Sequence, residues 1–167
     1  KSDERWRICS LRYFNPIGCH NSGLLGEDPK GEPNNLLPLI SQVANGVRDK
    51  LMVFGDDYPT KDGTGVRDYI HVVDLARGHI CAQQHLKYSN GYKAYNLGTG
   101  LGSSVLEMIA SFVSISGKDV EFEIVGRREG DVPECVADAS LAERELGWKS
   151  QYDLDVMLKD NWAWVTK

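Results

Sequence analysis

Two arginines, Arg67 and Arg128, are the residues of this sequence best suited to bind an anion. The forked donors of a guanidinium bind two oxygens of a phosphate together, and a lysine would not replace them well. Arg128 belongs to a charged stretch at residues 127–131, in which Asp131 is a candidate acceptor for a hydroxyl group. The alternatives are an ion pair of Arg67 with the adjacent Asp68 or with another carboxylate, and a solvated charged turn at 127–131.

Aromatic and polar side chains close the first predicted strand, which covers residues 11–14. They are Tyr13, Phe14 and Asn15. Because parallel strands end at the edge where α/β proteins bind ligands, we expect these residues at a ligand crevice whose other wall lies outside this sequence. The alternative is that Asn15 only ends the strand before Pro16.

A helix predicted over residues 36–45 offers a second site for an anion. Asn34 or Asn35 is placed to cap it, Pro38 is tolerated in its first turn, and Gly46 is placed to end it. The free N–H groups and the dipole of a helix N-terminus favour a phosphate. Asn35 and Leu36 are therefore candidate ligand contacts, although a plain N-cap needs no ligand.

A short apolar strand is predicted at residues 51–54, and it contains Met52, Val53 and Phe54. Apolar residues in such a strand usually build the core. An irregular stretch at 55–65 follows, and the alternation at 66–71 predicts a half-buried strand.

The rest of the chain continues to alternate helices and strands. A helix near Asp74 is predicted to bury one face and to end towards Gly91; that face comprises Val72, Leu75, Ala76, His79 and Ile80. A strand at 94–97 leads into a Gly-x-Gly-x-Gly turn, which we interpret as structural because no acidic residue follows the next strand. The sequence therefore predicts an α/β fold.

Three further elements complete this pattern. Ser104 with Glu107, and Ser140 with Glu143, have the spacing of capping boxes at helix starts. Residues 120–124 alternate as an exposed or edge strand, and residues 154–165 form a final amphipathic helix.

The composition excludes several classes of protein. A chain of 167 residues with 41% hydrophobic residues can bury one core, and a net charge of −5 argues against nucleic-acid or membrane partners. The four cysteines have no metal or disulfide spacing, so we expect free buried thiols, a cytoplasmic location and no metal site.

Six motifs, which occur in a fixed order, carry a specific resemblance to known sequences. They are Leu11-Arg12-Tyr13-Phe14-Asn15-Pro16, Gly26-Glu27-Asp28-Pro29, Pro33-Asn34-Asn35-Leu36, Gly63-Thr64-Gly65-Val66-Arg67-Asp68-Tyr69-Ile70-His71-Val72, Tyr95-Asn96-Leu97-Gly98-Thr99-Gly100 and Arg127-Arg128-Glu129-Gly130-Asp131. Together they closely resemble the UDP-glucose 4-epimerases, which are extended short-chain dehydrogenases/reductases with a Rossmann-type fold. The resemblance extends from about residue 6 to residue 164 and corresponds to the C-terminal, substrate-binding part of that family.

The resemblance implies a reaction of galactose metabolism. Hydride moves from C4 of the sugar to bound NAD while a tyrosine takes the hydroxyl proton, and the keto-sugar receives the hydride on its other face. It further implies that Tyr13 and Phe14 flank the nicotinamide, that Asn15 binds the sugar diphosphate, and that Asn35 and Leu36 contact the nucleotide. Met52, Val53 and Phe54 would contact uracil, Arg67 and Arg128 the diphosphate, and Asp131 a ribose hydroxyl.

Two elements of that reaction are missing from the sequence. None of the seven tyrosines has a lysine four residues later, and no Gly-x-x-Gly-x-x-Gly turn occurs. In the family both precede the strand at 11–14, so we interpret residues 1–167 as a single substrate-binding portion without the NAD-binding domain, with the last strand of the parallel sheet at its start. We expect no catalytic residue in this portion, no turnover by it alone, and a homodimer for the complete enzyme.

Cys135 corresponds to a position near the C2 substituent of the sugar, where the family has bulky residues in members restricted to plain hexoses. A thiol leaves room, so the complete enzyme is also expected to act on UDP-GlcNAc and UDP-GalNAc; the alternative is an ordinary buried thiol. The other functions that remain open are an epimerase acting on UDP-glucuronate or UDP-arabinose, and a stand-alone, non-catalytic module that binds sugar nucleotides.

Overall fold

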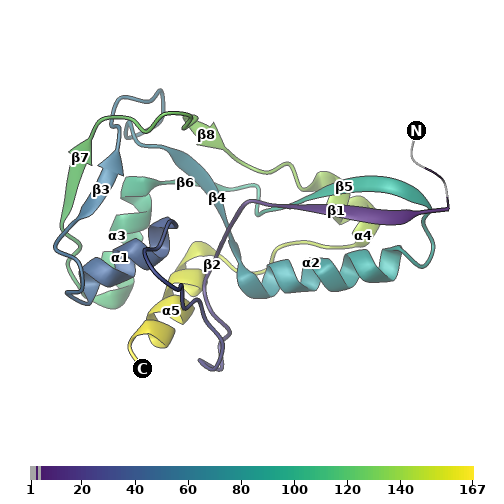
Figure 1. The fold of residues 1–167 in the computed structure, drawn as a ribbon, viewed down its shortest axis with the longest axis horizontal. Helices are drawn as coiled ribbons and strands as arrows, with labels where there is room; N and C mark the ends of the chain where they lie inside the picture. The colour runs from purple at the N-terminus through teal and green to yellow at the C-terminus, as the bar shows by residue number, and fades with distance from the viewer. Residues whose placement is uncertain (1–2, 4) are drawn as a thin grey trace.

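The computed structural model describes residue 3 and residues 5–167. Figure 1 shows strands β1 and β5 with helix α2 at one end of the molecule, β3 and β7 with α1 and α3 at the other, and β2 and β4 between them. The helices are α1 (Leu36–Ala44), α2 (Val72–His85), α3 (Val105–Ser116), α4 (Ser140–Leu146) and α5 (Leu154–Val165). The strands are β1 (Arg7–Tyr13), β2 (Asn15–Ile17), β3 (Leu51–Phe54), β4 (Val66–His71), β5 (Gly91–Leu97), β6 (Gly102–Ser104), β7 (Phe122–Val125) and β8 (Glu134–Cys135).

Parallel pairing predominates among these strands. β1 pairs with β5 along its whole length, β2 with β4, β3 with β7, and β8 with β4, whereas β4 and β6 are antiparallel. The predicted α/β class is therefore confirmed. The sequence led us to expect β1 as the last strand of the parallel sheet. That expectation is wrong, because β5 lies parallel to β1 from Arg7↔Gly91 to Tyr13↔Leu97.

Two hydrophobic clusters support these strands. The larger one packs α1, α3 and α5 against β3 and the middle strands, and includes Leu37, Ile40, Phe112 and Leu158. The second lies under β5 and α4 and is centred on Trp148, whose indole N–H donates to the carbonyl oxygen of Asp74 at 2.9 Å. The cavity described below lies on the side of the first cluster. Strand β3 and the N-terminus of α1 line it.

Local capping signals determine several helix ends. Ser104 and Glu107 form the predicted capping box of α3, which ends at Gly117 in the left-handed conformation. For α4 the predicted capping box is wrong: the N-cap is Ala139, with no side-chain hydrogen bond, and Ser140 is the first helical residue. The structure thus begins α4 one residue earlier than a Ser140 cap would, and the N–H of Ser140 donates to a carboxylate oxygen of Asp138 at 3.0 Å.

Helix α2 differs from its predicted amphipathic pattern. Its buried residues are Asp74, Gly78 and Ala82, whereas Ile80, from the predicted buried face, is 54% exposed. Gly78 is buried because Leu97 and Trp148 pack so closely that a Cβ at this position would lie 2.6 Å from a Leu97 methyl carbon. Small residues therefore face the second cluster, and the helix ends at His85, before Gly91 begins β5.

The cysteines are also more accessible than predicted. All four are free, but only Cys19 is buried; Cys9 and Cys81 are half-buried and Cys135 is exposed. Within the part of the chain that the structure describes, no helix is long and apolar enough to cross a membrane.

Candidate functional site

A cavity of about 300 Å³ brings together segments that are far apart in the sequence. Ten of the twelve predicted site residues line it: Phe14, Asn15, Asn35, Leu36, Met52, Val53, Phe54, Arg67, Arg128 and Asp131. They come from the end of β1, the start of β2, the N-terminus of α1, all of β3, the beginning of β4 and the loop between β7 and β8. The fold therefore gathers most of the predicted site in one place.

Asp131 lies between the two predicted phosphate-binding arginines. Arg128 donates to both of its carboxylate oxygens, from Nε at 3.1 Å and from Nη2 at 2.9 Å. Arg67 approaches the same carboxylate with Nη2 at 3.6 Å, while its Nη1 donates to the carbonyl oxygens of Val66 and Val132. Two guanidinium groups thus share one carboxylate. The hydrogen bonds of Arg128 to Asp131 raise the pKa of Arg128.

Asp68 makes none of the contacts to Arg67 that the alternative interpretation required. It is fully buried and accepts hydrogen bonds from the turn after β5 and from the segment after β8. Adjacent residues of a strand point to opposite faces, so Arg67 faces the cavity while Asp68 faces the turn. Asp68 as the partner of Arg67 is therefore wrong, but the alternative of an ion pair with another carboxylate agrees with the approach of Arg67 to Asp131. The Gly-x-Gly-x-Gly turn has a structural role.

The first turn of α1 supplies the second element of the anion site. Asn35 is its N-cap, but the Asn35 side chain makes no capping hydrogen bond and instead donates to a carboxylate oxygen of Glu27 at 3.3 Å. No acidic side chain lies in the first turn. The free N–H groups at this helix end therefore remain available to an anion, together with the positive end of the helix dipole.

Aromatic rings form one side of the cavity. The side chain of Phe54 is 43% exposed, and the guanidinium of Arg128 lies 5.7 Å from the centre of its ring. Tyr69, on the same face of β4 as Arg67, is buried, and burial raises its pKa to about 12. Flat apolar surface beside two cations suits a ligand that carries both a planar ring and an anionic group.

Two predicted residues do not line this cavity. Tyr13 is half exposed, and its hydroxyl donates to Nε2 of His79 at 2.5 Å, because Nδ1 of that ring carries the proton donated to Leu75 O. Cys135 lies on β8, opposite Arg67 in the strand register, and its exposure shows that the alternative of a buried thiol is wrong.

Sequence reasoning proposed none of the other ten lining residues as ligand contacts, and three of these carry polar or aromatic side chains: Asn34, Tyr58 and Tyr69. The period of two in β4 could have identified Tyr69, which is two residues from Arg67 and so shares its face. Tyr58 lies in the irregular stretch after β3, and no periodicity marks it. Its position depends on contacts with a segment about seventy residues later, which no local pattern contains.

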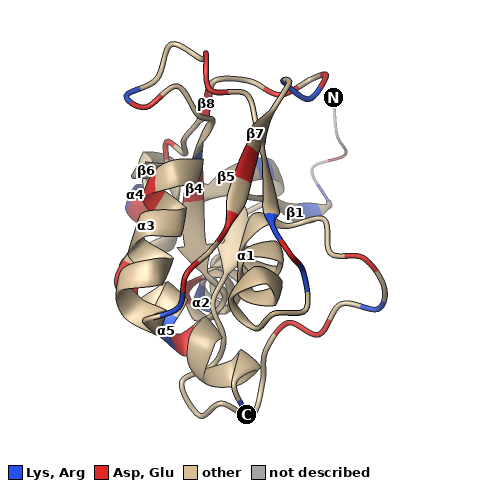
Figure 2. Cartoon of the chain, turned by 90° about the vertical axis from the view of Figure 1, so that its left-hand side faces the viewer, with Lys and Arg blue, Asp and Glu red and all other residues tan. Residues whose placement is uncertain are grey.

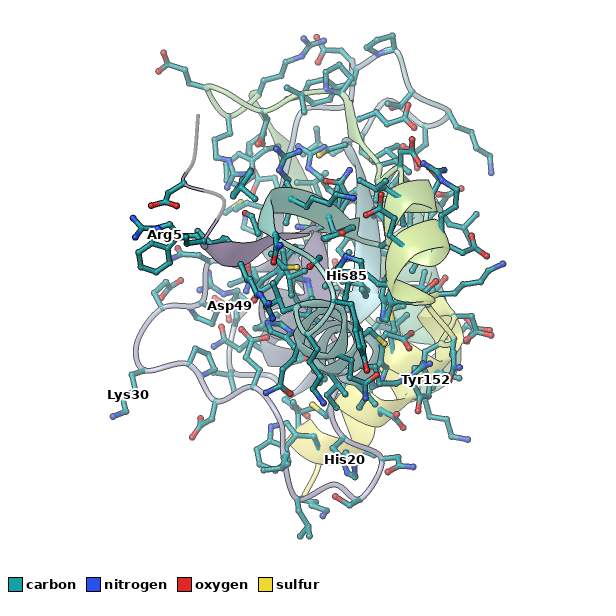
Figure 3. All side chains as sticks on the ribbon, turned by 90° about the vertical axis from the view of Figure 1, so that its right-hand side faces the viewer. Arg5, His20, Lys30, Asp49, His85 and Tyr152 are labelled. Atoms are coloured by element: carbon teal, nitrogen blue, oxygen red, sulfur yellow. The ribbon has the colours of Figure 1, made fainter. Side chains whose placement is uncertain are left out.

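The charged residues are distributed unevenly over the surface. Figure 2 shows basic and acidic residues close together on the loops above β7 and β8, and one acidic residue, Glu123, lies on β7 itself. The histidines labelled in Figure 3, His20 and His85, lie well apart, one in the loop after β2 and one at the end of α2. Among the described residues, no group of three or more histidine, cysteine, aspartate or glutamate side chains could hold a metal ion.

Comparison with known proteins relates this arrangement to one family. The family described as GDP-mannose 4,6 dehydratase matches residues 2–161. The chain belongs to this family of extended short-chain dehydrogenases/reductases. It is a homologue of UDP-glucose 4-epimerases: it is 58% identical, over its whole length, to 48% of the UDP-glucose 4-epimerase of Drosophila melanogaster.

Solved structures of family members share this fold. The UDP-glucose 4-epimerase of Bifidobacterium longum, in complex with NAD+ and UDP, matches 98% of this chain at 53% identity with a TM-score of 0.94, over 49% of its own length. The enzyme of Stenotrophomonas maltophila, with bound NAD and formylated UDP-arabinopyranose, matches 97% at 54% identity, also with a TM-score of 0.94, over 48% of its length. The chain thus spans about half the length of the relatives it matches.

Proposed function

We propose that this chain is the C-terminal, substrate-binding part of an NAD-dependent UDP-glucose 4-epimerase that interconverts UDP-glucose and UDP-galactose. One observation carries the proposal: a single cavity is lined by two guanidinium groups, a helix N-terminus, a carboxylate and exposed aromatic surface. A nucleoside diphosphate offers a partner for each of these groups: phosphates for the guanidinium groups and the helix N-terminus, a ribose hydroxyl for the carboxylate and a planar base for the aromatic surface. The names of the homologues agree with a uridine nucleotide as the ligand.

The described contacts suggest how the nucleotide would bind. Arg128 holds Asp131 by an ion pair in which the arginine side chain is 60% exposed, and such a pair contributes little to stability. A diphosphate can therefore take over the arginine donors and leave Asp131 to accept a ribose hydroxyl. Asn35 and Leu36 would add the N–H groups of the helix start, and Asn15 would bind the sugar diphosphate.

The base would lie along β3. Phe54 presents part of its ring to the cavity, and the backbone of Met52 and Val53 would contact the edge of uracil. Val53 itself is buried, so its side chain belongs to the core while its backbone borders the cavity. This division of roles explains why an apolar strand can serve both core and ligand.

NAD, when bound, would supply the oxidation and reduction at C4 of the sugar. The chain offers Phe14 at the cavity and the half-exposed Tyr13, whose hydroxyl is held by His79, as contacts for the nicotinamide end. The pyrophosphate of NAD requires a glycine-rich turn, and the sequence contains no Gly-x-x-Gly-x-x-Gly spacing. The main cofactor site and the catalytic tyrosine are accordingly proposed for the other half of the complete protein.

Binding of UDP to the 167-residue chain tests this proposal directly. Isothermal titration should show that UDP binds, that ADP binds less tightly, and that Arg67→Met weakens both. A chain that is folded by circular dichroism but does not distinguish UDP from ADP would contradict the proposed uridine site.

Turnover in the complete protein separates the alternatives. We expect epimerisation of UDP-galactose by the complete protein, as a homodimer, and none by the 167-residue chain alone. Preferential turnover of UDP-glucuronate or UDP-arabinose would favour the related epimerases. Tight UDP binding without turnover of any UDP-sugar would favour a stand-alone binding module.

The side chain of Cys135 is proposed to limit the size of the substituent that the sugar can carry at C2. Its side chain is exposed on β8 beside Arg67, so its volume affects the space next to the diphosphate site. We expect the complete protein to convert UDP-GlcNAc and UDP-GalNAc, and Cys135→Tyr to lower that activity relative to turnover of UDP-galactose. Normal UDP-galactose activity without turnover of UDP-GalNAc would show that this extension of the substrate range is wrong.

A further inference from the structure

Arg127 has a different set of contacts from its neighbour Arg128. Its Nε donates to a carboxylate oxygen of Asp57 at 2.6 Å, and its Nη2 donates to the backbone carbonyl of the same residue at 2.6 Å. Its guanidinium carbon also lies 4.2 Å from the centre of the Tyr58 ring. One side chain therefore binds the loop after β3 by a charge-assisted pair, a backbone contact and a cation–π stack.

The backbone around these contacts is closely fitted. Gly55 donates its N–H to the carbonyl of Val125 at 2.9 Å, which joins the ends of β3 and β7. A Cβ at Gly55 would lie 2.8 Å from Cγ of Arg127 and 2.9 Å from the Tyr58 ring, and its φ of +82° is one that glycine adopts readily. The stacked pair thus lies directly against the Gly55 backbone.

Tyr58 is held by its ring and backbone, not by its hydroxyl. The side chain lines the cavity although the residue is only 6% exposed, and its N–H donates to the carbonyl of Gly63. Among the described residues, its buried hydroxyl has no hydrogen-bond partner. Leaving a buried hydroxyl unpaired is unfavourable. Two roles are therefore open to Tyr58: its ring supports the loop by stacking, or its hydroxyl forms a hydrogen bond with a bound ligand.

The nucleotide-binding side chains lie immediately after Arg127. Asp131 donates its N–H to the carbonyl of Arg128 in a turn that contains Gly130 at a φ of +85°. Holding residue 127 determines where this turn starts, and hence where Arg128 and Asp131 point. Without that contact the order of the turn would rest on the exposed Arg128–Asp131 pair and on the contacts of Arg67 with Asp131 and with the carbonyl oxygen of Val132.

We propose that Arg127, Asp57 and Tyr58 form a clamp that positions Arg128 and Asp131 for nucleotide binding. The three are positioning residues, since they act through the loop they hold, and the ring of Tyr58 is used as a platform. The inference rests on the proposed function for its ligand, but the clamp itself is a property of the chain without ligand.

Charge-changing variants separate positioning from simple attraction of the phosphates. With UDP as the probe for the 167-residue chain, Arg127→Gln should weaken binding about tenfold, equivalent to about 1.4 kcal/mol. Asp57→Asn removes a negative charge near the site, so simple attraction predicts tighter binding, whereas the clamp predicts weaker binding. Unchanged or tighter binding by Asp57→Asn would overturn the proposal.

Conservative variants test the geometry. Arg127→Lys keeps the charge but cannot reproduce both bonds to Asp57, so it should recover only part of the lost affinity. The matched control for loss of one positive charge is Lys149→Gln, whose exposed pair with Glu143 involves α4 and not the cavity. Full recovery by lysine, or an equal loss in the control, would show that charge alone accounts for the effect.

The two roles open to Tyr58 predict opposite results. If the ring is a platform, Tyr58→Phe should bind UDP like the unchanged chain, whereas Tyr58→Leu should weaken binding as Arg127→Gln does. A loss in Tyr58→Phe would instead assign the hydroxyl to the ligand and overturn the platform.

Hydrogen exchange without ligand tests the clamp independently of the proposed function. The amides of residues 128–131 should exchange faster in Arg127→Gln and Asp57→Asn than in the unchanged chain and in Lys149→Gln. Equal exchange would overturn the clamp even where UDP binds. Failure of the unchanged, folded chain to bind UDP would contradict the proposed function, while faster loop exchange in the variants would still support the clamp.

Discussion

Replacement of Asp68 by asparagine exchanges one carboxylate oxygen for an NH₂ group. We expect this change to lower the free energy of unfolding strongly. Its carboxylate is fully buried and makes four hydrogen bonds as an acceptor. One oxygen accepts from the N–H of Thr99 at 2.9 Å and from its hydroxyl at 2.6 Å. The other accepts from the N–H groups of Gly100 at 2.9 Å and Ala137 at 3.1 Å.

The expected magnitude follows from these partners. An asparagine keeps one oxygen, but its NH₂ group faces two donors and can accept from neither. Each hydrogen bond to a charged group contributes about 1.5–3 kcal/mol, so the loss of two should lower the free energy of unfolding by about 3–6 kcal/mol. The shape of the side chain hardly changes, so no cavity term is added.

Urea denaturation followed by circular dichroism measures this effect. With an m-value of about 2 kcal/mol/M, the urea midpoint of Asp68→Asn should fall by about 1.5–3 M. Asp155→Asn is the matched control, because Asp155 is exposed in the first turn of α5 and should change stability by less than about 0.5 kcal/mol. An Asp68→Asn midpoint within about 0.3 M of the unchanged chain at equal m-value would refute this account of the buried carboxylate.

Three further predictions concern the site and its supports. Arg67→Lys should raise the dissociation constant for UDP about tenfold, since an ammonium loses the forked geometry, and calorimetric affinity equal to that of arginine would contradict this role. Burial raises the pKa of Tyr69 to about 12, so its contribution to stability is present below pH 10 and lost as the pH rises towards 12, by about 1.4 kcal/mol per unit; urea midpoints at pH 9 and pH 11 should therefore differ less in Tyr69→Phe. Gly63→Ala would place a Cβ 1.9 Å from the carbonyl oxygen of Asp56 at a φ of +82° and should cost about 2–4 kcal/mol of stability by the same assay; Gly46→Ala, at a φ of +70° with nothing within 4 Å, is its control and should cost about 1–2 kcal/mol.

Local sequence patterns were sufficient for most of the elements. The helix from Leu36, the capping box of Ser104 and Glu107, and the final helix from Leu154 all lie where the sequence predicts them. These signals act within one or two turns of the chain, so their physical basis is contained in a short segment. The strands at Leu51–Phe54 and Val66–His71 also lie where the sequence predicts them. The short strands β2, β6 and β8 were not predicted, because each forms by pairing with β4, which is distant in the sequence.

The membership of the site was also largely predictable, but through resemblance and not through pattern. Six motifs in order established the resemblance, and the resemblance implied roles for the ten residues that the fold gathers around one cavity. Spacing alone left each of them with an ordinary structural alternative: an N-cap for Asn35, core packing for Phe54 and an ion pair for Arg67. No local rule chooses between those roles, because each role is locally compatible with the same residue type.

The amino-acid sequence by itself determined the α/β class, most element positions and the residue types available to bind a nucleotide. Tertiary structure alone decided which partner each charged group has: Asp68 accepts from a turn some thirty residues later, and Arg127 contacts Asp57 across seventy residues. It also decided that α2 buries Gly78 in place of Ile80. These choices depend on which surfaces meet when distant segments pack, and the geometry of that meeting is absent from any short stretch of sequence.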